Sequence, residues 1–208
     1  MRVDLHVHSK YSGHSMLGLE RIAKTAKTKG LDAIALTDHD TMDGAKQLSR
    51  IFPTIVGEEI SCDEGDIIGL FLNETIPRGH VEEVIDRIRS QGGIVVVPHP
   101  FDSMRSEAVM SEEICAKGDA IEVFNSRVVR AKDNAKAYRI AESLGKPKVV
   151  GSDAHLGIEI GRSWMDIESI GDSHLFMKSL ASAGMHTSRS PILAHAQTKL
   201  LKVKEAFR

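Results

Sequence analysis

The chain has 208 residues, of which 41% are hydrophobic and 27% charged, and its formal net charge is −2. This composition predicts one domain over residues 1–208, and the near-neutral charge gives no reason to expect binding to duplex nucleic acid. The chain begins directly with a strand pattern, has no apolar run of membrane-spanning length, and pairs neither Cys62 nor Cys115 in a CxxC motif. We therefore expect a cytoplasmic protein with reduced thiols and no membrane partner.

Short apolar runs alternate with helical patterns along the chain. Strands are predicted over 3–7, 33–37, 54–59, 67–72, 94–97, 120–124 and 148–151. Apolar residues recur at helical spacing over 19–26, 81–88 and 131–144, and each pattern is followed by a glycine stop. This alternation favours an α/β fold with a mainly parallel sheet. An amphipathic helix is predicted over 192–207, with its lysines on a solvated face.

The region 54–72 departs from this alternation. Only a short polar segment, 61–65, separates two strand patterns, which is too little chain for a crossover helix. The two strands are therefore predicted to form a hairpin. An antiparallel return would place Asp66 beside Glu59 on the same face.

Histidines and acids follow the ends of the apolar runs. The C-terminal ends of parallel strands meet on one face of an α/β barrel, so these side chains are expected to gather around metal ions. Taken singly, the His6–His8 pair could be two hydrogen-bonded core histidines, His99 could face solvent on a rigid turn, and Asp38 could cap a helix or orient a histidine. The predicted nitrogen and oxygen ligands are His6, His8, His39, Glu59, His99, Asp153 and His155.

Five motifs resemble the PHP (polymerase and histidinol phosphatase) family in its small stand-alone form. They are Asp4-Leu5-His6-Val7-His8-Ser9, Leu36-Thr37-Asp38-His39-Asp40, Gly57-Glu58-Glu59-Ile60-Ser61, Val97-Pro98-His99-Pro100-Phe101 and Gly151-Ser152-Asp153-Ala154-His155. The resemblance implies a distorted (β/α)7 barrel that holds two or three divalent ions, of Mn, Zn or Fe.

The resemblance also implies a distribution of the ligands. His6, His8, Glu59 and Asp153 would hold a first ion. Glu59 would bridge to a second ion, completed by His99 and by Asp66, where many members carry a histidine. His39 and His155 would bind a third ion. Where the family usually has an acid near the first motif, this chain has His14, which is either a ligand or an ordinary loop residue.

The expected function is that of a metal-dependent phosphoesterase acting on a small phosphomonoester or a nucleotide or oligonucleotide end. Metal-activated hydroxide would attack phosphorus, and His39 or His155 could protonate the leaving group if its metal position is empty. Arg127 and Arg162, which follow a strand and a glycine, are candidate phosphate contacts.

Weaker candidates for phosphate contact are Lys10 and Tyr11, next to the first motif. Two other functions remain open at this stage, an amidohydrolase-like metal hydrolase and a non-catalytic metal-binding accessory module. The hairpin acid Glu59 and the Pro98-His99-Pro100 motif argue against the amidohydrolase, and the nearly complete ligand set argues against the accessory module.

Overall fold

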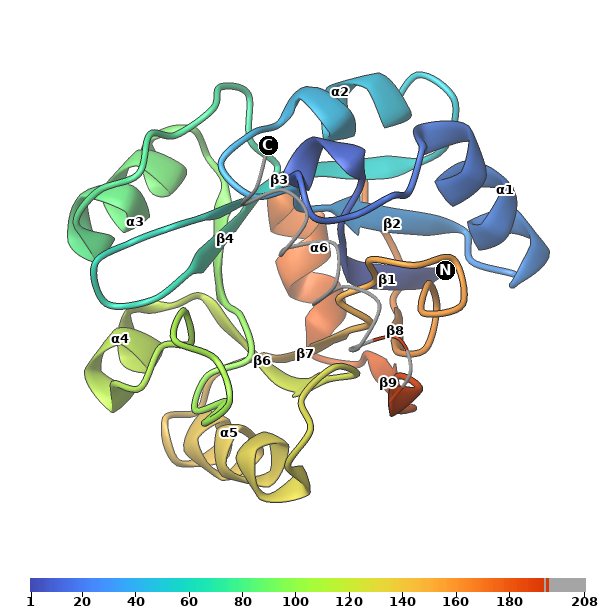
Figure 1. The fold of residues 1–208 in the computed structure, drawn as a ribbon. Helices are drawn as coiled ribbons and strands as arrows, with labels where there is room; N and C mark the ends of the chain where they lie inside the picture. Colours follow the sequence, from blue (N-terminus) through green and yellow to red (C-terminus); the bar gives the residue numbers. More distant parts are fainter. Residues whose placement is uncertain (193, 195–208) are drawn as a thin grey trace, which may run out of the picture.

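A nine-stranded mixed sheet, curved into a nearly closed barrel, forms the centre of the computed structural model, which describes residues 1–192 and 194 (Figure 1). The strand order is β7-β6-β5-β4-β3-β2-β1-β8-β9. The strands are β1 (Arg2–Val7), β2 (Ala33–Leu36), β3 (Thr54–Ile60), β4 (Ile67–Leu70), β5 (Ile94–Val97), β6 (Ala120–Asn125), β7 (Lys148–Gly151), β8 (Trp164–Asp166) and β9 (Gly184–His186).

Six α-helices connect these strands in the described part of the chain. They are α1 (Leu19–Thr28), α2 (Asp43–Leu48), α3 (Val81–Ser90), α4 (Glu112–Lys117), α5 (Ala131–Ser143) and α6 (Ser173–Leu180). A 3-10 turn, η1 (Lys10–Ser12), follows the first strand. The seven predicted strands and the helices at α1, α3 and α5 are confirmed, whereas the short elements α2, α4, α6, β8 and β9 were not predicted. The predicted helix over 192–207 falls, except for Ile192 and Ala194, outside the described residues.

The barrel closes between β1 and the segment that follows β7. Val7 forms a parallel bridge with Ala154, and the backbone N–H of His8 donates to the carbonyl of Ala154 at 2.9 Å. The motifs 4–9 and 151–155 are distant in sequence, yet this closure sets them side by side. The remaining strands bring the other three motifs to the same end of the barrel.

The predicted hairpin is confirmed. Strands β3 and β4 pair antiparallel, with Glu59 opposite Ile68 and Ile60 opposite Ile67. Strand β4 is also antiparallel to β5, so it is the reversed strand in an otherwise mostly parallel succession. Its reversal puts Asp66, the residue before β4, at the barrel end where β3 finishes.

Helices α1 and α3 lie on the outside of the barrel, and each buries one apolar face against it (Figure 1). In α3, Val84 and Ile88 pack with Leu70 of β4 in a large core cluster, and Ile22 of α1 packs with Leu36 of β2 in a second. Phe176 of α6 is fully buried and joins the first cluster. Within residues 1–192 and 194, no helix has both the length and the apolar character needed to cross a membrane. Burial of these apolar faces fixes the barrel that positions the polar end.

Candidate metal centre

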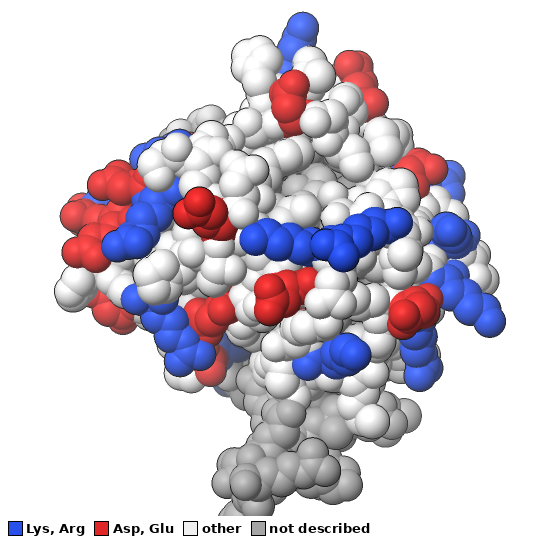
Figure 2. All heavy atoms as spheres, turned by 90° about the horizontal axis from the view of Figure 1, so that it is seen from above, with Lys and Arg blue, Asp and Glu red and all other residues white. Residues whose placement is uncertain are grey.

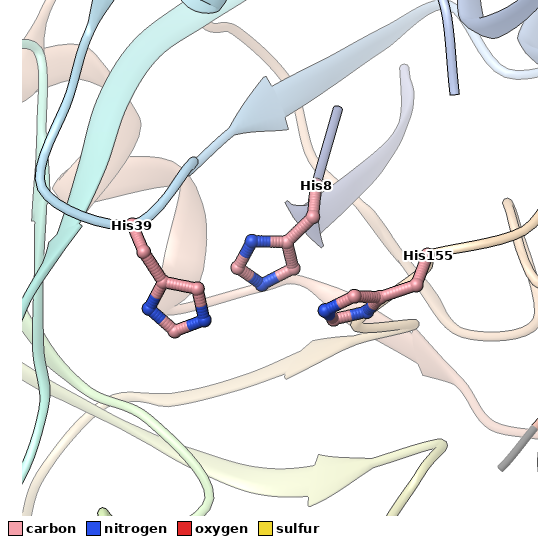
Figure 3. A group of neighbouring side chains, drawn as sticks. All are labelled: His8, His39 and His155. Carbon is pink, nitrogen blue, oxygen red and sulfur yellow. The ribbon is translucent and has the colours of Figure 1, made fainter. Parts of the chain in front are cut away.

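The predicted ligands converge at the C-terminal end of the barrel strands. Figure 3 shows His8, His39 and His155, which come from the end of β1, the loop after β2 and the loop after β7, with their rings side by side. Four groups of three side chains bring their ligand atoms within 4.8 Å of one another. They are His8–His39–His155, His6–Glu59–His99, His6–His8–Asp153 and His39–Glu59–Asp66.

Glu59 is the central acid of this cluster. Its Oε2 lies 3.4 Å from Nε2 of His6, 3.2 Å from Nε2 of His8 and 3.5 Å from Nδ1 of His39. Its Oε1 lies 3.1 Å from Nε2 of His99. One carboxylate therefore faces histidines on both of its oxygens, which is the arrangement that a bridging ligand between two cations requires.

His14 is also brought to the cluster. Its ring centroid lies 5.0 Å from that of His39 and 4.7 Å from that of His155. An imidazole thus stands beside the third histidine group, at the position where the family resemblance predicts an acid.

Backbone strain accompanies two of the predicted ligands. His99 and Asp153 have φ values of 29° and 53°, in the left-handed region that non-glycine residues rarely adopt. Such strain persists where surrounding contacts fix the residue, and it concentrates at functional sites.

Neighbouring groups orient the histidines. Nδ1 of His6 lies 3.1 Å from a carboxylate oxygen of Glu122, and Nδ1 of His155 lies 2.9 Å from the carbonyl of Asp153. Both partners are acceptors only, so each ring carries its proton on Nδ1 and directs Nε2 into the cluster. Glu122 was not predicted as a site residue, although a charged residue inside the apolar strand 120–124 was a signal.

A relay fixes the ring of His8 in the same way. Nδ1 of His8 lies 3.0 Å from Oγ of Ser12, and this hydroxyl donates to Oδ1 of Asp38 at 2.6 Å. The hydroxyl proton is used by Asp38, so Ser12 accepts from Nδ1 of His8. Asp38 therefore orients a histidine through Ser12.

The site attracts positive charge. Burial opposes protonation of His6 and His8, but the carboxylates around them, Glu122, Glu59 and Asp153, outweigh it and raise the pKa of both histidines. Nε2 of His6 and Nε2 of His8 lie 3.0 Å apart, a contact that requires either a proton on one of the two nitrogens or a cation that both can bind. Oδ1 of Asp153 is buried beside them with no hydrogen-bond partner. These residues therefore fit a divalent ion, which would take the place of the proton.

The pKa values of His39 and His155 are shifted in the opposite direction, downward. Burial lowers the pKa of His39 to about 4, and burial together with the nearby His8 lowers that of His155 well below its usual value. Both rings are therefore neutral at neutral pH, with one N–H and one nitrogen lone pair to offer. This favours the role of ligand over that of leaving-group acid.

The mixed imidazole and carboxylate donors suit Zn, Mn or Fe. Asp66 contributes a further carboxylate, although its pKa is raised to about 8 by burial and by the charge of Glu59. A proton on Asp66 is the expected state until a cation neutralises Glu59.

A cavity of about 540 Å³ opens over the cluster. Arg127 lines it and donates to Oε2 of Glu159 at 3.1 Å, whereas Arg162 is not among its described lining residues and donates to the carbonyl of Ile158. Lys10 and Tyr11 are likewise not among the described lining residues; Nζ of Lys10 lies 5.6 Å from the centroid of the Tyr11 ring.

Arg105, which was not predicted, lines the cavity as well and contacts Asp153 at 2.5 Å.

Comparison with known proteins agrees with the motifs. The sequence matches the PHP domain over residues 4–92 and the PHP-associated region over residues 131–182. One uncharacterized protein of Methanocaldococcus jannaschii is 40% identical over 142 residues, which cover 61% of this chain and 82% of that protein. A second uncharacterized protein of the same organism is 34% identical over 177 residues, which cover 82% of this chain and 72% of that protein. A "Probable phosphatase" of Thermoanaerobacter sp. (strain X514) is 25% identical, covering 77% of this chain and 81% of that protein.

Solved structures share the fold. A "putative metal-dependent phosphoesterase" from Bifidobacterium adolescentis has a TM-score of 0.64 at 16% identity, covering 92% of this chain and 97% of that chain. An amidohydrolase from Chromobacterium violaceum has a TM-score of 0.66 at 18% identity, covering 88% and 96%. A lesion-specific endonuclease from Pyrococcus furiosus has a TM-score of 0.60 at 19% identity, covering 89% of this chain and 57% of that chain. The motifs, the ligand geometry and the family matches together establish that the chain belongs to the PHP family of metal-dependent hydrolases.

Proposed function

We propose that the protein hydrolyses phosphate esters, with a small phosphomonoester or a nucleotide end as its substrate. The observation that carries the proposal is the position of Glu59, whose two oxygens face different histidines and whose neighbours His39 and Asp66 line a cavity that arginines also line. Divalent ions held by these residues beside the arginines would match a tetrahedral dianion better than an uncharged amide or lactone. The name of the relative in Thermoanaerobacter supports the same substrate class.

The proposed reaction transfers a phosphoryl group to water. The water oxygen forms a bond to phosphorus while the ester P–O bond breaks, giving inorganic phosphate and an alcohol. Divalent ions held by the clustered histidines and carboxylates would polarise the phosphoryl group and lower the pKa of the attacking water. Glu122, Ser12 and Asp38 fix the histidine rings, so the donor atoms need no reorganisation when the ions bind.

The size of the cavity is suited to a small molecule. Its volume of about 540 Å³ lies within the usual range for ligand pockets. On the face shown in Figure 2, a short row of basic side chains crosses the middle, and acidic side chains lie around it. This supports a small phosphorylated partner over a long duplex.

The test couples metal analysis to substrate turnover. Purified protein loaded with Mn²⁺, Zn²⁺ or Fe²⁺ would be assayed for phosphate release from nucleotides, bisphosphates and short oligonucleotides, and in parallel against cyclic amides and lactones. We expect phosphate release only. Turnover of amides or lactones alone would identify an amidohydrolase-type enzyme, and metal binding without any turnover would identify an accessory module.

Variants tie the activity to the site. We expect His8→Ala and Asp153→Ala to lose bound metal and at least about 100-fold in rate, because each removes a ligand rather than a group behind one. His174→Ala, on the exposed surface of α6, is the matched control and should keep both. Full metal content and full activity in His8→Ala and Asp153→Ala would refute the site.

A further inference from the structure

Arg105 links the arginine-lined cavity to the metal centre. Its Nε donates to Oδ2 of Asp102 at 3.0 Å, and its Nη2 donates to Oδ2 of Asp153 at 2.5 Å. Both acids are buried, and the arginine side chain is 24% exposed. The guanidinium is therefore held on two edges by carboxylates that cannot move into solvent.

Asp153 divides its two oxygens between different partners. Oδ2 accepts from Arg105, while Oδ1 lies 3.3 Å from Nε2 of His8 and has no hydrogen-bond partner. One carboxylate thus separates the guanidinium from the histidine cluster. A phosphate group that reached the cluster would lie beside Arg105.

The loop that carries Arg105 is built around the ligand His99. The N–H of Asp102 donates to the carbonyl of His99 at 3.3 Å, and the N–H of Arg105 donates to the carbonyl of Asp102 at 3.1 Å. Oδ1 of Asp102 accepts from the N–H of Met104 at 3.1 Å. Because the loop is hydrogen-bonded internally, little conformational entropy is lost when the guanidinium takes up a further partner.

The guanidinium retains unused donors. It has five N–H groups in a planar fork, and the two carboxylates account for one on Nε and one on Nη2. The side chain lines the cavity beside His155 and Arg127. Arg127 is 7% exposed and pairs with Glu159, which is not a member of the ligand groups.

We propose that Arg105 is a catalytic residue that donates from its free N–H groups to a non-bridging oxygen of the substrate phosphate. The inference rests on the proposed phosphoesterase function and deepens it, because it names the side chain that selects a phosphate over an uncharged group. A charged donor on a non-bridging oxygen also stabilises the negative charge of the transition state. Asp102 and Asp153 then act as the fixed supports of this donor.

The test measures phosphate binding and turnover separately. Inorganic phosphate would be titrated calorimetrically into the metal-loaded protein and into Arg105→Met, and turnover of p-nitrophenyl phosphate would be followed in both. We expect Arg105→Met to bind phosphate about 10- to 100-fold more weakly and to lose kcat/KM by at least as much. Arg105→Lys keeps the charge but not the fork, so it should fall between the two.

The controls separate a substrate contact from a structural role. Because Arg105 also donates to the predicted ligand Asp153, the two proteins are compared at full metal loading, confirmed by mass spectrometry, and Arg139→Met, on the exposed face of α5, should resemble the wild type throughout. Phosphate affinity of the fully loaded Arg105→Met within about twofold of that of the wild type, or no phosphate binding by the wild type, would each overturn the proposal. If no phosphate ester is turned over while phosphate binding still depends on Arg105, the proposed function fails and the Arg105 contact stands.

Discussion

Glu122 lies 3.1 Å from Nδ1 of His6, and both side chains are buried. Its other oxygen accepts the backbone N–H of His99 at 2.7 Å and Nδ2 of Asn125 at 3.0 Å. One acid in the middle of β6 therefore orients a predicted ligand at the end of β1 and another after β5. The centre is held together by this carboxylate as well as by its direct ligands.

Glu122→Gln should weaken metal binding by about 10- to 100-fold, the usual effect of removing a group that orients a metal ligand. Three donors converge on the two oxygens of Glu122, so an amide would turn its own N–H₂ toward one of them. Calorimetric titration with Zn²⁺ or Mn²⁺ measures the effect. Glu142→Gln, at an exposed position in α5, is the control, and equal affinities in the two variants would contradict the assignment.

Gly151 is the point where β7 comes closest to these groups. A Cβ at this position would lie 2.4 Å from Cβ of His6 and 2.6 Å from Oε1 of Glu122, so one of them would have to shift. We expect Gly151→Ala to lower the free energy of unfolding by about 1–3 kcal/mol and to reduce metal affinity at the same time. Urea denaturation and metal titration check both effects.

Gly79→Ala provides the comparison for Gly151. Its added Cβ would come no closer than 3.9 Å to a neighbouring heavy atom outside the adjoining residues. It should therefore leave metal affinity unchanged. A Gly151→Ala protein with native metal affinity would show that the backbone of β7 can shift to accommodate the methyl group without displacing His6.

The convergence of the predicted ligands was predictable because it depends on where the strands end and on the register of one hairpin. Parallel strands place their C-terminal residues together whatever the loops do, which brings His39 and Asp153 to the same place. The short segment 61–65 between two strand patterns was enough to predict the hairpin of β3 and β4. This hairpin places Asp66 near Glu59. Periodicity and spacing carry this information.

The groups around the ligands were less predictable because loops and side-chain partners decide them. Arg105 lies in an irregular loop where spacing does not fix the direction of a side chain. The role of Glu122 could not be predicted, because a single acid in a strand does not reveal which side chain it will contact. Arg127 and Arg162 were equivalent in the sequence, and only the three-dimensional structure shows that one lines the cavity.

Arg127 and Arg162 should therefore differ in their effect on catalysis. Removal of Arg127 alone would leave the buried Glu159 without its cationic partner, so the informative variant is the double substitution Arg127→Met/Glu159→Gln, which removes both charges. We expect it to raise KM for p-nitrophenyl phosphate about 10-fold or more, and Arg162→Met to leave KM unchanged. Equal effects of the two would show that the cavity wall at Arg127 does not contact substrate.

Glu58 predicts a pH dependence of stability. It is buried in β3, where Oε2 accepts the N–H of Ile76 at 3.0 Å and Oε1 has no partner. Burial raises its pKa from 4.5 to about 7. Between these values the folded protein retains a proton that the unfolded chain has released, so the free energy of unfolding falls as pH rises from 4.5 to 7 and stays lower above that.

Glu58→Gln removes this ionisation and keeps an acceptor for Ile76. A rise in pKa from 4.5 to about 7 corresponds to at most about 3 kcal/mol. The variant should therefore be more stable than the wild type by up to that amount at about pH 8, and the difference should shrink toward about pH 5, where Glu58 is protonated in the folded state. Urea denaturation of the metal-free protein with a chelator present measures it, because bound metal would add its own pH-dependent stabilisation. Glu74→Gln, at an exposed position, should show no such difference, and a Glu58→Gln effect that is the same at both pH values would mean that folding does not raise the pKa of Glu58.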